Sequence, residues 1–243
     1  VANVKADMLL AVTQWCEGPG LEGKARIGSL TTPDMERIIA LAPDIVIGTE
    51  MTPMHVYESL EASGIPCVVF KHQDLADVME DMRRICAILG QDEEGAKILD
   101  SMAARRDAVL ARIPDASPVK VALLYDLESM GSAGKGSWVD DMFTSIGLDN
   151  IANRAQSAWP RLSFEALIGG QPRWIIIPMP SDAGMAAAMK AQIEAMKTDS
   201  VWLRVDAARE GRLLIVPEIL LNVPGPRTLD AMDHLSRAIH GGE

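Results

Sequence analysis

Aromatic and basic residues are scarce in this chain of 243 residues. Phe, Trp and Tyr make up only 4% of it, and 23 Lys and Arg stand against 34 Asp and Glu, for a formal net charge of −11. This balance argues against nucleic acid as a partner, because phosphate binding needs clustered positive charge. Acidity names no other partner, since many soluble proteins are acidic.

Cysteine and histidine are also few, which argues against a zinc site. The three cysteines leave at least one thiol unpaired and lack zinc-type spacing. We expect Cys67 and Cys86 to pack as small apolar side chains, whereas Cys16 lies in a predicted loop. The four histidines form no metal pair in the first half of the chain, and no Gly-x-Ser-x-Gly turn is present. An α/β enzyme therefore stands as a distant alternative.

Long apolar runs are absent as well. None approaches the ~20 residues that a transmembrane helix needs, so we expect a soluble chain. No signal peptide stands at Val1, and residues 8–12 already have the pattern of a strand. We interpret the sequence as a mature or truncated chain whose export signal has been removed.

Short apolar runs alternate with helical patterns along the chain. Runs that are apolar on both faces and separated by helices indicate parallel sheets covered on both sides. We expect helices from Met35, around residues 78–89 and from near Trp138 to Leu148, with Thr32 capping the first of them before Pro33. The predicted strands are Met8–Thr13, Asp44–Ile47, Pro66–Phe70, Val119–Tyr125, Trp174–Pro178 and Arg212–Val216.

One segment, Asp92–Ile113, predicts a helix much longer than the others. It carries acids in its first turn and arginines toward its end, which matches the helix dipole, and prolines stop it. Three predicted strands precede this helix and three follow it. We therefore expect an N-terminal lobe over 1–91, a connecting helix over 92–115 and a C-terminal lobe over 116–243. A single continuous sheet with a long crossover helix is the alternative.

Five segments, in the right order along nearly the whole chain, resemble the helical-backbone class (class III) of periplasmic substrate-binding proteins. That class serves ABC importers of cobalamin, ferric siderophores and haem. The segments are MERIIALAPDIVIG (Met35–Gly48), LEASGIPCVVF (Leu60–Phe70), MGSAGKGSWVDDMFTSIGLDNIA (Met130–Ala152), WPRLSFEALIGGQPRWIIIP (Trp159–Pro178) and PGPRTLDAMDHLSRAI (Pro224–Ile239).

The resemblance implies an α/β protein of two Rossmann-like lobes, joined by one rigid backbone helix, with a ligand cleft between them. It further implies a monomer without an intrinsic cofactor or an enzymatic activity. Such a protein is periplasmic or otherwise extracytoplasmic, with or without a lipid anchor, and docks to an ABC permease with its ATPase. The family opens with one more strand and helix, so the first strand of the N-terminal lobe is missing here or the sequence is incomplete.

Within this class, AVTQWCEGP (Ala11–Pro19) and the Trp159–Pro160 pair are most similar to cobalamin-type members. Leu30 and Leu220 are aliphatic where a cobalamin cleft has aromatic residues. A ferric siderophore or haem is therefore the alternative ligand, with Arg161, Arg173 and Arg227 as the arginines it would use. A non-transport interaction module that inherited the fold is a further possibility.

Several residues are candidates for contact with the metal-chelate ligand. Trp15 follows a predicted strand, where α/β proteins place ligand sites, and offers a flat apolar face. Tyr125 ends a strand, and Lys135 with Ser137 precedes a helix start that could hold an anion. The candidates are Trp15, Cys16, Glu50, Tyr125, Lys135, Ser137 and Trp159.

Acidic residues are candidates for permease docking, since the family pairs one acid on each lobe with permease arginines. Glu50 and Glu58 are the candidates in the first lobe and Glu218 in the second, where Asn222 is the alternative position. His55, beside Met51 and Met54, is a candidate for a metal ligand; the alternative is a surface or capping residue, the more common role of a lone histidine.

Overall fold

The structure is a computed structural model that describes residues 6–14, 16, 18 and 20–241. The chain forms two compact units, residues 1–71 with 80–97 and residues 72–79 with 98–243. The boundary between the two units falls within the long helix, between Lys97 and Ile98. The lobe boundaries expected from the sequence stay a prediction.

The N-terminal unit contains two pairs of parallel strands, and buried Ile38, Val56, Leu60 and Ile65 form its main apolar cluster. The expectation that a first strand is missing from this unit stays a prediction. Its elements are the 3-10 helix η1 (Ala6–Met8), the strands β1 (Ala11–Val12), β2 (Ala25–Arg26), β3 (Val46–Thr49) and β4 (Cys67–Phe70), and the helices α2 (Met35–Leu41) and α3 (Met54–Ala62).

Two details of this unit differ from the sequence-based prediction. The strand expected over Met8–Thr13 is short, because residues 6–8 turn as η1, and its partner β2 was not predicted. Asp34, not Thr32, caps α2: its carboxylate accepts a hydrogen bond from the backbone N–H of Arg37 at 3.0 Å. Thr32 instead bonds to Ser29 through its backbone N–H.

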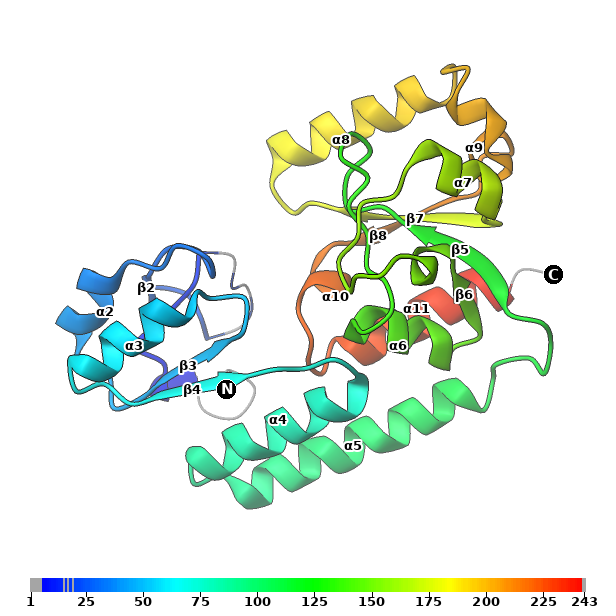
Figure 1. The fold of residues 1–243 in the computed structure, drawn as a ribbon. Coiled ribbons are helices and arrows are strands. Elements are labelled where there is room, and N and C mark those ends of the chain that lie inside the picture. Colours follow the sequence, from blue (N-terminus) through cyan, green and yellow to red (C-terminus); the bar gives the residue numbers. More distant parts are fainter. Residues whose placement is uncertain (1–5, 15, 17, 19, 242–243) are drawn as a thin grey trace. The chain divides into compact units, whose positions relative to one another are not determined.

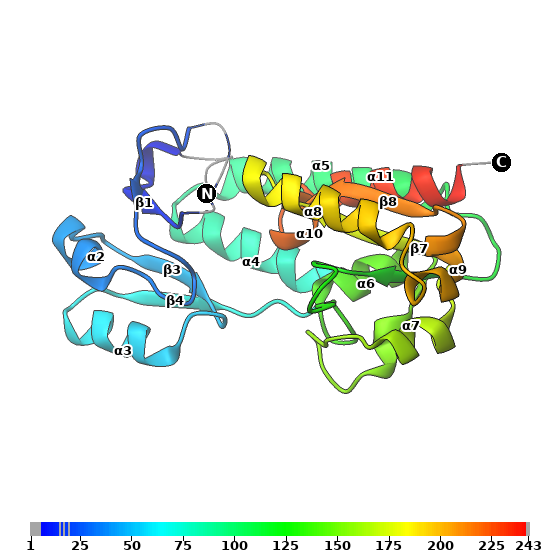
Figure 2. The ribbon, with the colours of Figure 1, turned by 90° about the horizontal axis from the view of Figure 1, so that it is seen from above.

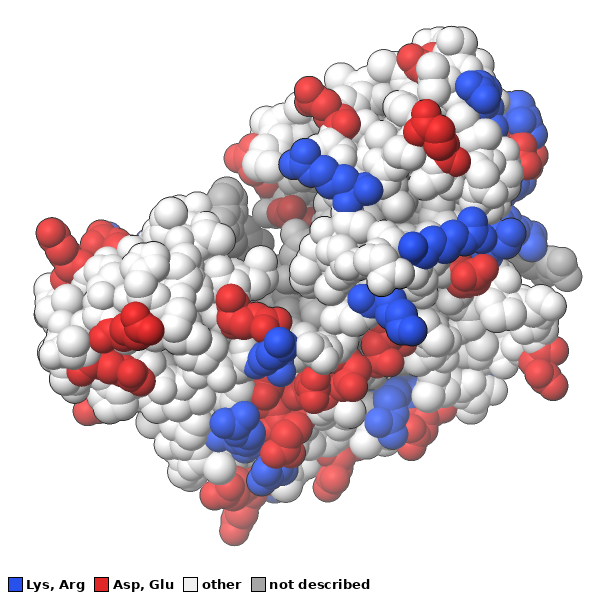
Figure 3. All heavy atoms as spheres, in the orientation of Figure 1, with Lys and Arg blue, Asp and Glu red and all other residues white. Residues whose placement is uncertain are grey.

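The helices α4 (Leu75–Ile88) and α5 (Asp92–Leu110) confirm the helical prediction for these stretches, although the long helix ends three residues before Ile113. Gly90 has φ +62°, a left-handed conformation that favours glycine, and it follows the end of α4. The two helices approach closely, because a Cβ at Gly95 would lie 2.6 Å from the Cβ of Cys86. Red and blue side chains stand side by side in the lower part of Figure 3, in keeping with ion pairs such as Glu80–Arg83 and Glu94–Lys97.

The C-terminal unit is built on a parallel sheet in the order β6-β5-β7-β8. Its elements are β5 (Val119–Leu123), α6 (Trp138–Ser145), β6 (Leu148–Asn150), the 3-10 helix η2 (Ile151–Arg154), α7 (Phe164–Gly170), β7 (Trp174–Met179), α8 (Ala183–Met196), the 3-10 helix η3 (Trp202–Arg204), α9 (Asp206–Arg209), β8 (Leu213–Pro217), α10 (Ile219–Asn222) and α11 (Thr228–His240).

Strand β6 corrects the prediction that Leu148 continues the helix from Trp138. Gly147 has φ +74°, which ends the helical path, and the chain enters the sheet directly beside β5. The apolar residues before Leu148 are spaced as in a helix, so the sequence pattern predicted a helix where this short strand forms.

Helices cover both faces of this sheet, as the doubly apolar strands predict. Figure 1 shows α7, α8 and α9 on one side of it and α6 and α11 on the other. Ala122 and Leu124 join the cluster that includes Met189 and Trp202, while Leu123 between them is equally buried and faces the opposite side. Figure 2 shows α11 running alongside α5, and the ion pairs Arg105–Asp230 and Arg112–Asp233 link the two segments.

Candidate functional site

The order of the strands points to one edge of the C-terminal sheet. The first strand of the unit, β5, lies between β6 and β7, so the chain leaves it on one side and returns on the other. In open parallel sheets, ligands bind at the carboxyl ends of the strands that flank such a switch point. Here those ends are the segments directly after β5 and β7.

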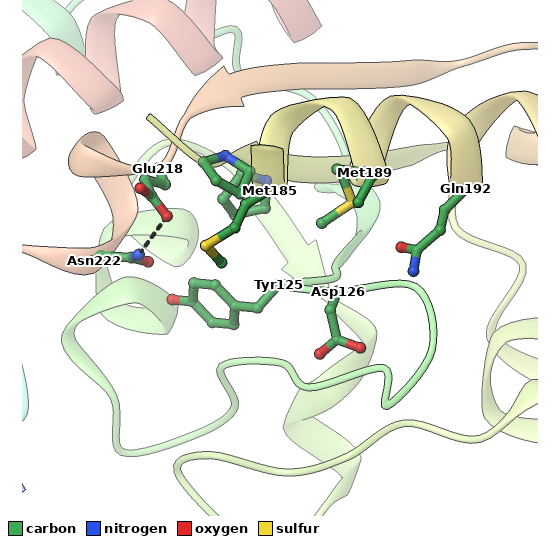
Figure 4. A pocket seen from close by; sticks show the side chains of 10 residues that line it. Tyr125, Asp126, Met185, Met189, Gln192, Glu218 and Asn222 are labelled. Carbon is green, nitrogen blue, oxygen red and sulfur yellow. Dashed lines mark hydrogen bonds between the residues drawn. The ribbon is translucent and has the colours of Figure 1, made fainter. Parts of the chain in front are cut away.

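A cavity of about 280 Å³ lies at this edge (Figure 4). Residues that follow β5, β7 and β8 form one wall, and α8 supplies the other. Figure 4 shows Met185 pointing from α8 toward Tyr125, and Gln192 pointing toward Asp126. The lining residues are Tyr125, Asp126, Pro178, Pro180, Met185, Ala188, Met189, Gln192, Glu218 and Asn222.

An aromatic pair stands beside the cavity. The ring of Tyr125 lies 6.4 Å from that of Trp159, with the planes inclined at 47°. The Tyr125 hydroxyl donates a hydrogen bond to the Leu221 carbonyl at 3.1 Å, and burial raises the pKa of Tyr125, so the phenol stays neutral. The Trp159 side chain is 51% exposed, which is unusual for so large an apolar ring. The pair therefore offers a fixed aromatic surface.

Backbone hydrogen bonds hold the segment that carries Trp159. Gly134 donates its N–H to Ala158 at 2.8 Å, and Ser132 donates to Pro160 at 2.8 Å. Gly134 permits this approach because a Cβ at that position would lie 2.7 Å from the carbonyl oxygen of Ser157. These contacts with the loop before α6 thus position the tryptophan.

Asp126 contributes a carboxylate to the cavity wall. Burial raises its pKa, but hydrogen bonds from the Ser129 hydroxyl and from the backbone N–H groups of Ser129 and Glu128 outweigh burial. The net effect lowers the pKa of Asp126 below its usual value, so the group is ionised at neutral pH.

Replacing Asp126 by asparagine is expected to destabilise the protein at pH 7. A depressed pKa contributes stability above the unfolded value, near 3.9, and that contribution disappears as the pH falls through the lower, folded value. In urea unfolding, the stability difference between Asp126→Asn and wild type should therefore stay constant well above about pH 3.9 and shrink as the pH falls below it. Glu128→Gln, at an exposed neighbouring position, controls for the loss of one charge. A difference that does not change with pH would contradict this account.

Glu218 brings a second carboxylate to the cavity, directly after β8. It accepts a hydrogen bond from the Ser181 backbone N–H at 2.9 Å and from the Ser181 hydroxyl at 3.3 Å. The Asn222 amide lies 3.5 Å from its other oxygen, as the dashed line in Figure 4 marks. These uncharged donors fix the orientation of the carboxylate.

Comparison with known families gives the site its context. The family model described as periplasmic binding protein matches residues 5–220 of the chain. The chain belongs to this family. The family that the sequence resembles is thereby confirmed, as is the α/β architecture with parallel sheets.

Relatives of this periplasmic binding protein include the vitamin B12-binding protein of Vibrio parahaemolyticus. That protein is 26% identical over 234 residues, which cover 93% of this chain and 79% of the relative. Among solved structures, the periplasmic vitamin B12 binding protein BtuF of Vibrio cholerae has a TM-score of 0.81, with 20% identity over 98% of this chain and 91% of that one.

The periplasmic heme binding protein HutB of Vibrio cholerae reaches the same TM-score of 0.81, with 18% identity over 98% of this chain and 95% of that one. At these identities the structural likeness establishes the fold alone.

Over the described residues, no helix has both the length and the apolar character that crossing a membrane requires.

Of the residues singled out from the sequence, Tyr125 lines the cavity and Trp159 lies against it, 6.4 Å away between ring centroids. Glu218 also lines the cavity, although it was predicted for permease docking and not for the ligand. Lys135 is exposed in the loop before α6, and Ser137 is buried with its hydroxyl capping α6 through the Asp140 N–H at 3.2 Å. Their predicted contact with a ligand stays a prediction.

The remaining candidates belong to the N-terminal unit. Cys16 is half-buried, with its Sγ 3.2 Å from the Thr13 hydroxyl, and Trp15 lies outside the described residues. Glu50 pairs with Lys71 at 3.1 Å. Glu58 and His55 are exposed on α3, and the described part of the chain holds no group of three or more His, Cys, Asp or Glu suited to a metal ion.

Sequence-based reasoning missed Asp126, Met185, Met189 and Gln192. Asp126 could have been found, because it directly follows Tyr125 at a predicted strand end. The residues of α8 carried no such signal, since a helix rich in Ala and Met has the ordinary composition of a packed helix.

Proposed function

We propose that this chain is the substrate-binding component of an ABC importer and that its ligand is cobalamin or a related corrinoid. The observation that carries the ligand class is the similarity to a vitamin B12-binding protein over 93% of the chain. In physical terms, a corrinoid is a large, flat macrocycle with apolar faces. An exposed tryptophan fixed against a tyrosine suits such a face, because it adds contact area at little entropic cost.

The remaining functional assignments follow from this proposal. Trp159 and Tyr125 contact the ligand, together with Trp15, Cys16, Glu50, Lys135 and Ser137. Glu50 and Glu58 dock to the permease from the N-terminal unit, with Glu218 or Asn222 doing so from the C-terminal one. The protein acts as a monomer outside the cytoplasm, with or without a lipid anchor, and catalyses no reaction.

A thermal-shift screen with cobalamin, haem and a ferric siderophore tests the proposed function. A ligand at 100 times its dissociation constant adds about 2.7 kcal/mol to the free energy of unfolding, which is a readily measured shift. We expect cobalamin to raise the melting temperature and the other two to leave it unchanged. A shift with haem or the siderophore alone would assign the alternative ligand, and no shift with any of them would remove the transport proposal.

A further inference from the structure

The cavity next to the aromatic pair has an unusual charge for a site that holds an organic chelate. Two carboxylates, Asp126 and Glu218, line it together with the amides of Gln192 and Asn222. No lysine or arginine is among its lining residues in the part of the chain that the structure describes. The polar part of this wall can therefore accept hydrogen bonds from a ligand, but it has no positive charge with which to neutralise an anionic ligand.

Both carboxylates are held by donors that carry no charge. Asp126 is ionised at neutral pH and accepts hydrogen bonds from Ser129 and Glu128 backbone groups and from the Ser129 hydroxyl. Glu218 accepts from Ser181 and lies beside Asn222. Each carboxylate oxygen has more than one acceptor site, so capacity remains for donors on a ligand.

We propose that this cavity recognises ligand amide N–H groups and rejects ligand carboxylates; the inference rests on the proposed corrinoid-binding function. A carboxamide presented to Asp126 or Glu218 makes a charge-assisted hydrogen bond. A carboxylate in the same place meets two like charges beside the apolar side chains of Met185 and Met189, where desolvation adds to the repulsion.

The acidic wall would distinguish corrinoids from haem and siderophores by the charge of the groups at the edge of the ligand. The corrin ring of cobalamin carries carboxamide side chains, whereas haem carries two propionate carboxylates and many siderophores are anionic. The cavity thus acts as a specificity filter within the site, in which the aromatic pair accepts flat rings and the acidic wall selects those whose edge is neutral.

Two corrinoids with the same ring test the filter directly. Dicyanocobinamide carries peripheral amides, and dicyanocobyrinic acid carries carboxylates in their place. We expect wild-type protein to bind the amide form about tenfold more tightly or better in equilibrium dialysis. The preference should persist at about 0.5 M salt, where the screening length falls to roughly 4 Å and long-range repulsion is lost.

Glu218→Gln removes one of the two carboxylates from the cavity and should reduce the preference several-fold, with the remainder due to Asp126. Asp126 is a poorer choice, because its carboxylate also orders the turn that follows it. Glu194→Gln is the matched control: Glu194 lies on the same helix as Gln192, is exposed, pairs with Lys197 and does not line the cavity. It removes the same net charge and should leave the preference unchanged.

The outcomes separate this inference from the proposed function. Equal binding of the two corrinoids, or equal effects of Glu218→Gln and Glu194→Gln, would overturn the filter while leaving corrinoid binding intact. Absence of binding for cobalamin and for both corrinoid probes would overturn the proposed function and the inference with it.

Discussion

Replacing Trp159 by alanine is expected to weaken corrinoid binding by roughly 30- to 1000-fold, which corresponds to about 2–4 kcal/mol. The ring is 51% exposed and rests against Tyr125, so it presents a large apolar face that no part of the described chain covers fully. Burying such a face against a macrocycle gives the largest single contribution expected at this site. Equilibrium dialysis of the variant with cyanocobalamin measures the effect.

The control for Trp159→Ala is Tyr125→Phe. That change keeps the ring that supports Trp159 and removes only the hydroxyl that bonds to the Leu221 carbonyl. We expect a much smaller loss of affinity, because the aromatic surface remains. Trp159→Ala itself should unfold at nearly the wild-type urea concentration, since exposed substitutions cost little. Undiminished affinity in a folded Trp159→Ala protein would show that the aromatic pair does not contact the ligand.

Replacing Trp202 by alanine is expected to lower the free energy of unfolding of the C-terminal unit by about 3–5 kcal/mol. The Trp202 side chain is only 7% exposed and packs edge-on against Phe164, with ring centroids 4.9 Å apart. It belongs to the apolar cluster on the face of the sheet that α7, α8 and α9 cover. Urea unfolding followed by circular dichroism measures the loss.

Leu203 provides a matched control for Trp202, because it is the next residue and is 36% exposed. We expect Leu203→Ala to cost less than about 1 kcal/mol. Similar costs for the two variants would mean that Trp202 contributes no more to the core than its exposed neighbour. Since α8 forms a wall of the cavity, a destabilised Trp202→Ala protein should also lose ligand affinity.

The architecture could be predicted because apolar runs of the correct length mark buried strands. Segments 119–125 and 174–178 have the apolar runs that parallel sheets require, and the sheet contains β5 over 119–123 and β7 over 174–179, so the first strand ends two residues earlier than predicted. Strand β6 escaped prediction because it has only three residues, and a pattern that short does not distinguish a strand from the end of a helix. Gly147 was the local signal that the helix had ended.

The site was only partly predictable. The rule that ligands bind at the carboxyl ends of strands singled out Tyr125, and the family resemblance singled out Trp159. Neither of them singled out α8, because the cavity wall that this helix supplies depends on how the helix crosses the sheet. Capping shows the same limit: Thr32 and Asp34 are both good capping residues, and only the backbone path selects Asp34.

Corrinoid binding is tested most directly by equilibrium dialysis of the purified protein against cyanocobalamin. We expect saturable binding of one corrinoid per chain, displaced by cobinamide and not by haem or a ferric siderophore. Binding of haem or a siderophore with no binding of cyanocobalamin, or no saturable binding at all, would contradict this expectation.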